Sequence, residues 1–306
     1  LYHSAPNVYG LYATQQKDSL TILMPRFEPE ELLALIERHR ISHAFMVPTM
    51  FVRLLKLPEH IRRQYDCSSV EHVTHAGAPC APEIKAAMIK WWGPVINEFY
   101  GGTESGAVTF CSSAEWLSHP GTVGRAVDNC RIEILSDTGV RQPPGVPGEV
   151  YTRLFCYPDF TYQNDERKRS EIDQGGLITL GDVGYLDADG YLHLCDRKRD
   201  MVISGGVNIY PAEIESVLLT MANVRDCAVF GIPDTEFGET LMGIVQPLED
   251  QTVDPEEVRT FLASRLADYK VPRRIEIRQE LPREDSGKIF NGRLRVWFHA
   301  DPVIEA

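Results

Sequence analysis

Residues 28–99 alternate between helical and extended patterns, and this alternation limits the fold more than any other feature of the chain. Residues 28–40 carry apolar side chains at helical spacing on one face, and Pro82 is suited to begin a helix that runs to about Trp92. Short apolar runs predict strands at residues 43–47, 70–75 and 95–99. Strands that alternate with helices in this way are typical of an α/β layer.

The chain after residue 122 has a different pattern, in which short strands are separated by turn residues. The pair Asp189-Gly190 favours a hairpin turn. We therefore predict a β-rich subdomain that completes this half of the chain. Its strands are expected at residues 131–135, 148–152, 177–180, 184–187 and 191–194.

A charged run at residues 196–200 indicates a joint to a second, smaller unit. Beyond it we predict a strand at residues 201–203, a turn at Gly205-Gly206, and further helices and strands. Together these elements form a unit of about 100 residues, which is an ordinary domain size. The helices are expected at residues 211–221 and 255–266, and the strands at residues 226–230, 241–246 and 274–277. The sequence thus predicts an α/β protein with a large domain over residues 1–198 and a small α+β domain over residues 199–306.

Charge and composition exclude several classes of protein. The net charge of −13 argues against a nucleic-acid partner, because nucleic-acid binders usually present a basic surface. No apolar run approaches the ~18 residues that span a bilayer, and no signal peptide is visible. The seven cysteines form no C-x-x-C pair and have no histidines at zinc spacing, which favours free thiols in a reducing compartment. We expect a cytoplasmic protein.

The segment from Asn97 to Ser105 carries the most suggestive chemistry. We interpret it as a strand that ends in a Gly101-Gly102 turn and presents Thr103 and Glu104. A hydroxyl group and backbone N–H groups can hold a phosphate, and a carboxylate suits Mg²⁺. The alternative is a tight turn with a solvated glutamate, and this segment by itself does not decide between them.

Four other segments have a functional and a plain structural interpretation. The small residues Gly77-Ala78-Pro79 can stack on a planar base near Tyr100, or form an ordinary strand-to-helix turn. Asp182 lies between two glycines and can bind ribose hydroxyls, or be a common turn aspartate. Arg197 belongs to a charged run that is either solvated or directed at a ribose or phosphate. Lys288, in a Ser-Gly-Lys-Ile loop, can neutralise developing phosphate charge or be one surface lysine among many.

The order of these motifs along the chain is what gives them meaning. Tyr-Gly-Gly-Thr-Glu, Gly-Asp, Asp-Arg-Lys-Arg-Asp, Ser-Gly-Gly-Val-Asn-Ile-Tyr-Pro-Ala-Glu-Ile-Glu and Ser-Gly-Lys-Ile follow one another over nearly the whole chain. In this order the sequence resembles the adenylate-forming superfamily, which comprises acyl- and aryl-CoA synthetases, firefly-type luciferases and peptide-synthetase adenylation domains. The fold that the resemblance implies is the end of a large adenylation domain followed by a small mobile C-terminal domain.

The resemblance implies roles for the residues of the motifs. Thr103 resembles the phosphate-contacting hydroxyl, Glu104 the Mg²⁺ carboxylate and Lys288 the mobile catalytic lysine. Asp182 and Arg197 resemble the ribose ligands, and Arg199 the hinge residue. The remaining nucleotide-binding positions are implied for Gly77, Ala78, Pro79, Asn97, Glu98, Phe99 and Tyr100, and the loop for thioester formation for Ser204, Gly205 and Gly206.

The implied reaction joins a carboxylic acid to AMP and then to the thiol of coenzyme A, with ATP and Mg²⁺. The acyl pocket is expected to be lined by His3, Phe45, Val47, Gly101 and Gly102. Because Phe45, Val47 and Phe99 are apolar and Gly101 and Gly102 are small, we expect a fatty, aromatic or sterol-type acid. The partners are therefore small molecules.

The superfamily's phosphate-binding loop is not found in this sequence and is expected upstream of Leu1. We therefore interpret the chain as the C-terminal part of a longer enzyme and expect the chain by itself to bind ATP poorly. Two alternatives stay open: an adenylation enzyme that loads a carrier protein, and a non-catalytic nucleotide-binding fragment. No carrier sequence follows Lys288, which favours a free-standing ligase; a luciferase-like role has no distinct support.

Overall fold

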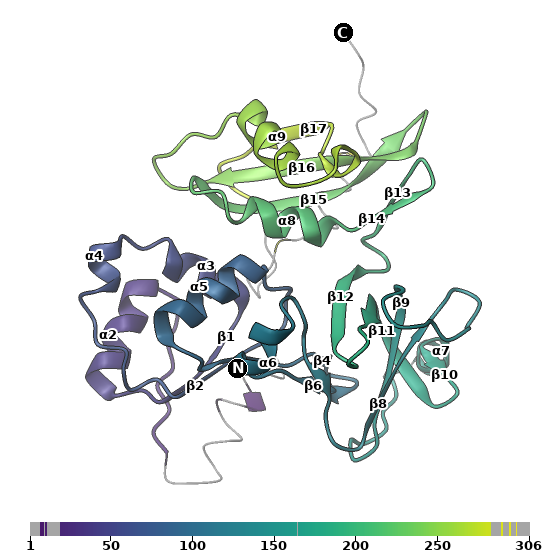
Figure 1. Cartoon of the computed structure of the whole chain (residues 1–306), viewed down its shortest axis with the longest axis horizontal. Coiled ribbons are helices and arrows are strands. Elements are labelled where there is room, and N and C mark those ends of the chain that lie inside the picture. Colours follow the sequence, from purple (N-terminus) through teal and green to yellow (C-terminus); the bar gives the residue numbers. More distant parts are fainter. Residues whose placement is uncertain are drawn as a thin grey trace. The chain divides into compact units, whose positions relative to one another are not determined.

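The computed structural model describes residues 7, 8, 10, 19–163, 165–282, 289, 294 and 298. The chain divides into two compact units (Figure 1). The first comprises Leu1–Leu180 and Tyr185–Leu194, and the second comprises Gly181–Gly184 and Cys195–Ala306. We predict a different kind of boundary between residues 198 and 199, where a small mobile domain begins. That boundary stays a prediction.

A parallel sheet forms the centre of the first half of unit one. Its strand order is β1-β2-β3, and residues between the strands form helices, as the sequence predicts. The strands are β1 (His43–Met46), β2 (His72–His75) and β3 (Ile96–Glu98), and the helices are α2 (Pro29–His39), α3 (Pro48–Leu55), α4 (Glu59–Arg62) and α5 (Pro82–Trp92). Figure 1 shows these helices grouped beside β1 and β2.

Helix α3 is an element that we did not predict. We interpreted Pro48 only as the end of a strand, but proline also suits the first turn of a helix, and here it begins α3. Helix α3 buries Phe51, Val52 and Leu54 against a core that includes Leu33 of α2 and Met88 of α5. The α/β layer is thereby closed on one side by apolar packing.

The rest of unit one is rich in strands, as predicted. Its main sheet has the order β10-β11-β9-β8, with β12 paired to β11. These strands are β8 (Cys130–Leu135), β9 (Gly148–Leu154), β10 (Asp173–Gln174), β11 (Leu177–Leu186) and β12 (Leu192–Arg197), of which residues 181–184 of β11 and 195–197 of β12 belong to unit two. Two small pairs, β4 (Gly101–Gly102) with β5 (Gly106–Ala107) and β6 (Thr109–Phe110) with β7 (Arg125–Ala126), and the helices α6 (Ser113–Ser118) and α7 (Glu166–Glu171) complete it.

Our prediction of two separate strands at residues 177–180 and 184–187 is wrong, because both belong to β11. We took Gly181 for a strand end. Its φ of +78°, a conformation open to glycine, instead bends the strand without ending it. The predicted hairpin turn at Asp189-Gly190 is present between β11 and β12, where the Asp187 amide donates to the Tyr191 carbonyl.

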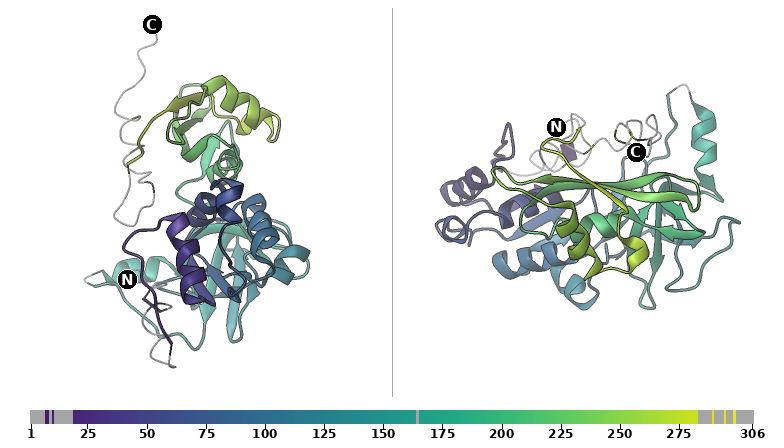
Figure 2. Two further views of the ribbon diagram at one scale, coloured as in Figure 1. Left: turned by 90° about the vertical axis from the view of Figure 1, so that its left-hand side faces the viewer. Right: turned by 90° about the horizontal axis from the view of Figure 1, so that it is seen from above.

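Unit two contains the predicted small α+β domain. Its sheet has the order β14-β13-β16-β15, with β17 paired to β16. The elements are β13 (Val202–Ser204), β14 (Val207–Ile209), α8 (Pro211–Leu218), β15 (Val224–Asp234), β16 (Gly238–Pro247), α9 (Pro255–Ala263), the 3₁₀ helix η3 (Asp268–Lys270) and β17 (Arg274–Ile277). The right-hand view of Figure 2 looks onto the two long strands β15 and β16.

The two faces of the β15–β16 ribbon are both buried, which explains why the middle of each strand, residues 227–232 and 241–245, is a continuous apolar run. Val229 and Val245 point to the face that α8 and α9 cover. Their neighbours Phe230 and Ile244 point to the opposite face and pack with Leu281. Since successive side chains of a strand alternate between faces, one apolar run supplies two cores.

Among the described residues, no helix combines the length and the apolar character needed to cross a membrane. All seven cysteines are free thiols. The cytoplasmic location stays a prediction.

Candidate functional site

Predicted site residues follow each of the three strands at the carboxyl edge of the parallel sheet. Val47 follows β1, Gly77 follows β2 and Phe99 follows β3. The rings of Phe45 and Phe99 lie 6.5 Å apart, although 54 residues separate them in the chain. Because ligands of open α/β sheets bind beyond the carboxyl ends of the strands, this edge is where a ligand is expected.

The residues that follow β2 are the exposed part of this edge. Gly77, Ala78 and Pro79 all lie on the surface. Gly77 has a φ of +86°, a left-handed conformation that favours glycine. These three small residues therefore present an open surface of the kind that a planar base requires.

The neighbouring Asn97, Glu98 and Tyr100 turn their side chains inward. The Asn97 amide donates to the Val95 carbonyl at 3.0 Å, and Tyr100 packs in an apolar cluster with Val108 and Val123. The Glu98 carboxylate is buried and accepts a hydrogen bond from Lys85. A nucleotide at this edge would thus meet the backbone of these residues, while their side chains hold the strand in place.

The Thr103–Ser105 turn joins β4 to β5. Our interpretation of Gly101-Gly102 as the turn is wrong, because both glycines form β4. Glycine is required at position 101 for lack of space: a Cβ atom there would lie 2.0 Å from the Gly106 carbonyl oxygen of β5. The hydroxyl of Ser105 accepts from the Gly102 amide at 3.0 Å and closes the turn, at which Thr103 is exposed.

Two tyrosines that are not among the predicted site residues contact this turn. The Tyr162 hydroxyl donates to Oε1 of Glu104 at 3.1 Å, and the Tyr157 hydroxyl donates to the Thr103 carbonyl at 3.2 Å. Burial, followed by the nearby carboxylate of Glu104, raises the pKa of Tyr162. No local pattern marks these tyrosines, because the contacts join segments more than fifty residues apart.

Unit two brings together the two predicted ribose ligands. Nε of Arg197 lies 3.5 Å from Oδ1 of Asp182, on the paired strands β12 and β11. The side chain of Asp182 is 13% exposed and that of Arg197 is 52% exposed. Asp182 lies within a strand and directly after the bend at Gly181, so the interpretation of Asp182 as a common turn aspartate is wrong.

The charged run that contains Arg199 is partly anchored. Asp196 accepts from the Ala212 amide at 2.9 Å, at the start of α8, and from the Arg197 amide at 2.7 Å. Arg199 is exposed, with Nε 3.7 Å from the Asp200 carboxylate. The chain before Arg199 is therefore tied to α8, and the side chain of Arg199 lies at the surface.

Ser204, Gly205 and Gly206 form the tip of the β13–β14 hairpin, as the predicted turn requires. Gly205 and Gly206 have φ angles of +56° and +81°, a pair of values that favours glycine in a two-residue hairpin turn. The Gly205 amide donates to the Phe237 carbonyl at 2.9 Å. Gly205 and Gly206 are thus exposed, and one hydrogen bond ties the tip of the hairpin to Phe237.

Two predicted site residues, His3 and Lys288, lie outside the described residues. Among the residues that the structure describes, no group of three or more His, Cys, Asp or Glu side chains could hold a metal ion. Glu104 is thus a single carboxylate. That donor set fits Mg²⁺ bound together with nucleotide phosphates, because Mg²⁺ is commonly held by one or two carboxylates plus substrate phosphates.

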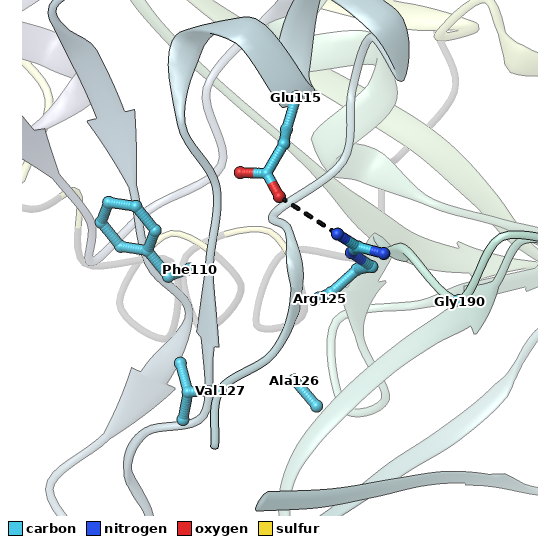
Figure 3. Close-up of a pocket in the computed structure, with 6 residues that line it drawn as sticks. All are labelled: Phe110, Glu115, Arg125, Ala126, Val127 and Gly190. Atoms are coloured by element: carbon cyan, nitrogen blue, oxygen red, sulfur yellow. Dashed lines mark ion pairs between the residues drawn. The ribbon is translucent and has the colours of Figure 1, made fainter.

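A separate cavity of about 440 Å³ lies elsewhere in unit one (Figure 3). Arg125 and Glu115 form an ion pair at 3.6 Å beside it. It is lined by Phe110, Glu115, Arg125, Ala126, Val127 and Gly190. None of these is a predicted site residue, so this cavity is distinct from the expected site.

Two known protein families match the chain, one in its first half and one near its C-terminal end. The family described as AMP-binding enzyme matches residues 1–154, which is half of the chain. The chain belongs to the AMP-binding enzyme family. The AMP-binding enzyme C-terminal domain matches residues 213–288, so the predicted superfamily and fold class are confirmed.

Curated relatives of this AMP-binding enzyme are named as CoA ligases. A long-chain-fatty-acid–CoA ligase of Bacillus subtilis is 34% identical over 94% of this chain and 52% of its own length. A feruloyl-CoA synthase of an Amycolatopsis species is 33% identical over 97% of this chain and 60% of its own length. The chain thus spans about half the length of the curated relatives that it matches.

Solved structures share the fold of this AMP-binding enzyme. The amide bond synthetase McbA of Marinactinospora thermotolerans has a TM-score of 0.80 and 32% identity, over 91% of this chain and 57% of that chain. The o-succinylbenzoate CoA synthetase MenE of Bacillus subtilis, in complex with its acyl-adenylate intermediate, has a TM-score of 0.81 and 28% identity, over 96% and 59% of the two chains.

Proposed function

We propose that the protein is an ATP-dependent carboxylate–CoA ligase that forms an acyl-adenylate and then a thioester. The observation that carries this proposal is the pair of Asp182 and Arg197, 3.5 Å apart on neighbouring strands. A carboxylate beside a cation offers an acceptor for ribose hydroxyls and a partner for phosphate in one place. The alternative interpretations, in which Asp182 is a turn aspartate and Arg197 belongs to a solvated charge run, do not require these two side chains to pair.

In the first half-reaction a carboxylate oxygen of the acid attacks the α-phosphorus of ATP. The bond to the bridging oxygen of the β-phosphate breaks, and pyrophosphate leaves. We propose that Thr103 contacts a phosphate through its hydroxyl, that Glu104 and the phosphates would hold Mg²⁺, and that Lys288 neutralises the reacting oxygens. Mg²⁺ would supply compensation of phosphate charge when bound.

In the second half-reaction the sulfur of CoA attacks the acyl carbon. The carbon–sulfur bond forms, the bond to the AMP oxygen breaks, and the thiol proton is released. We propose that the exposed Ser204–Gly206 loop serves this step, and that rotation at Arg199 exchanges the groups of the two steps. Gly77–Pro79, with the backbone of Asn97–Tyr100, would bind the adenine.

The acid that we propose is fatty or aromatic. Phe45 and Phe99 at the sheet edge supply apolar surface, and Val47 extends it. The names of the relatives, a fatty-acid ligase and a feruloyl-CoA synthase, agree with that class. His3, Gly101 and Gly102 stay predicted pocket residues.

A second candidate differs only in the acceptor. The similarity to an amide bond synthetase raises an amine as an alternative to the CoA thiol. Both candidates share adenylation, so the test has two parts. A panel of fatty, aromatic and short acids is screened by acid-dependent ATP–pyrophosphate exchange on the full-length protein, and the active acid is then offered CoA or an amine. Exchange with no acid of the panel would contradict the proposal; amide without thioester would favour the second candidate.

A further inference from the structure

The segment that follows β9 donates two hydrogen bonds to the Thr103–Ser105 turn. Tyr157 donates to the Thr103 carbonyl at 3.2 Å, and Tyr162 donates to the Glu104 carboxylate at 3.1 Å. One contact fixes the backbone of the turn, and the other fixes one oxygen of its only carboxylate. The second oxygen, Oε2, lies beside Gly102, 3.5 Å from the point where a Cβ of that residue would be.

The ring of Tyr162 is itself fixed by its neighbours. Phe160 packs edge-on against it with ring centres 5.5 Å apart, and Nζ of Lys168 lies 4.3 Å from the ring centre. Lys168 belongs to α7, where its amide donates to the Asp165 side chain at 3.1 Å. The hydroxyl is therefore presented to Glu104 by a packed ring and does not depend on a freely rotating side chain.

The segment around Tyr162 is also tied to the sheet. Arg169 of α7 donates to Asp159 at 3.1 Å and to Asp173 of β10 at 2.9 Å. Its guanidinium group lies 5.0 Å from the centre of the Phe160 ring. These contacts connect Phe160, and through it Tyr162, to strand β10.

We propose that Tyr162 is a positioning residue for the cation that accompanies the nucleotide: its hydroxyl holds Oε1 of Glu104 and leaves Oε2 to bind Mg²⁺. This inference rests on the proposed function, because it takes Glu104 as the Mg²⁺ carboxylate. A hydrogen bond to one oxygen of a metal-binding carboxylate restricts its rotation, and loss of such a partner lowers metal affinity by about 10- to 100-fold in other sites.

The test compares Tyr162→Phe with Tyr65→Phe. Tyr65 donates to Glu30 at 2.9 Å, so the control removes the same kind of hydrogen bond at α2, away from Glu104. Calorimetry measures binding of α,β-methylene-ATP to the full-length protein with Mg²⁺ and with EDTA. We expect Tyr162→Phe to weaken binding by about tenfold with Mg²⁺ and to leave binding in EDTA unchanged, and Tyr65→Phe to change neither.

A second comparison separates positioning from a general loss of structure. In a Glu104→Ala background the Tyr162→Phe substitution should have no further effect on Mg²⁺-dependent binding, because its target is gone. An equal effect in both backgrounds, or wild-type binding by Tyr162→Phe with Mg²⁺, would overturn the inference while the ligase proposal stands. Absence of both nucleotide binding and pyrophosphate exchange in the wild type would overturn the ligase proposal itself.

Discussion

Nζ of Lys85 lies 2.6 Å from the carboxylate of Glu98, and both side chains are almost completely buried in unit one. The pair joins α5 to the end of β3, one residue before Phe99. Nε2 of His75 lies 3.5 Å from the same carboxylate oxygen, and burial, with the nearby Lys85, lowers the pKa of His75 well below its ordinary value. Burial raises the pKa of Glu98, an effect that Lys85 opposes.

We predict that Lys85→Met destabilises the protein strongly. It leaves the Glu98 carboxylate buried without its cation, and breaking a buried pair in this way costs about 3–5 kcal/mol. Lys90→Met, on an exposed position of the same helix, is the matched control and should change stability by less than about 0.5 kcal/mol. The free energy of unfolding in urea measures both. Similar stability of the two variants would show that the Lys85–Glu98 pair does not stabilise the site edge.

We predict that Asp182→Ala weakens AMP binding. Removal of a carboxylate that accepts ribose hydroxyls should cost about 1–3 kcal/mol, or about 5- to 150-fold in Kd. Asp128→Ala, an exposed aspartate of the other unit, serves as the control. Calorimetry with AMP on folded full-length protein decides, and unchanged affinity in Asp182→Ala would reject the ribose assignment.

The hinge prediction concerns Arg199. Proline restricts φ to about −65°, so Arg199→Pro should favour one of two domain arrangements. We expect ATP–pyrophosphate exchange to survive and thioester formation to fall sharply, while Arg199→Ala retains both. Each half-reaction is measured separately, with synthetic acyl-adenylate and CoA for the second. Normal thioester formation by Arg199→Pro, or an equal loss of both steps in a folded variant, would contradict a hinge at this residue.

A pH-dependent prediction concerns Glu215 in unit two. Burial, opposed by a hydrogen bond from the Val229 amide and assisted by Asp196, Asp226 and Asp200, raises the pKa of Glu215 to about 8. The pKa of Glu215 in the folded state lies above its ordinary value of 4.5. The contribution of Glu215 to the stability of the folded state is therefore complete below pH about 4.5 and is lost as the pH rises through about 8.

Glu215→Gln keeps an acceptor for the Val229 amide, which lies 2.8 Å from Oε1 of Glu215, and removes the titration. We expect the variant to gain stability over the wild type progressively between pH about 4.5 and about 8, with no further gain above it. Hydrogen exchange of peptides from β15 reports on this unit, and each variant is compared with the wild type at the same pH. A difference that does not grow with pH would contradict the assignment.

The sequence predicted the periodic elements well and the contacts between distant segments poorly. Helix α5 and strand β17 have the predicted bounds, because Pro82 marks the start of the helix and alternating charged and apolar residues mark the strand. Lys85 is indistinguishable in sequence from a surface lysine, since its partner Glu98 comes from another element. The pairing of Tyr162 with Glu104 likewise depends on the route of the chain through β9 and α7, which no local pattern encodes.

The proposed function is tested most directly by the nucleotide products of the full-length protein. With Mg²⁺, ATP, CoA and an acid that supports pyrophosphate exchange, the products are separated and quantified by chromatography. An AMP-forming ligase must release AMP and pyrophosphate in amounts equal to the CoA ester formed. We predict that result; formation of the ester with ADP and phosphate, or without consumption of ATP, would contradict the adenylate mechanism.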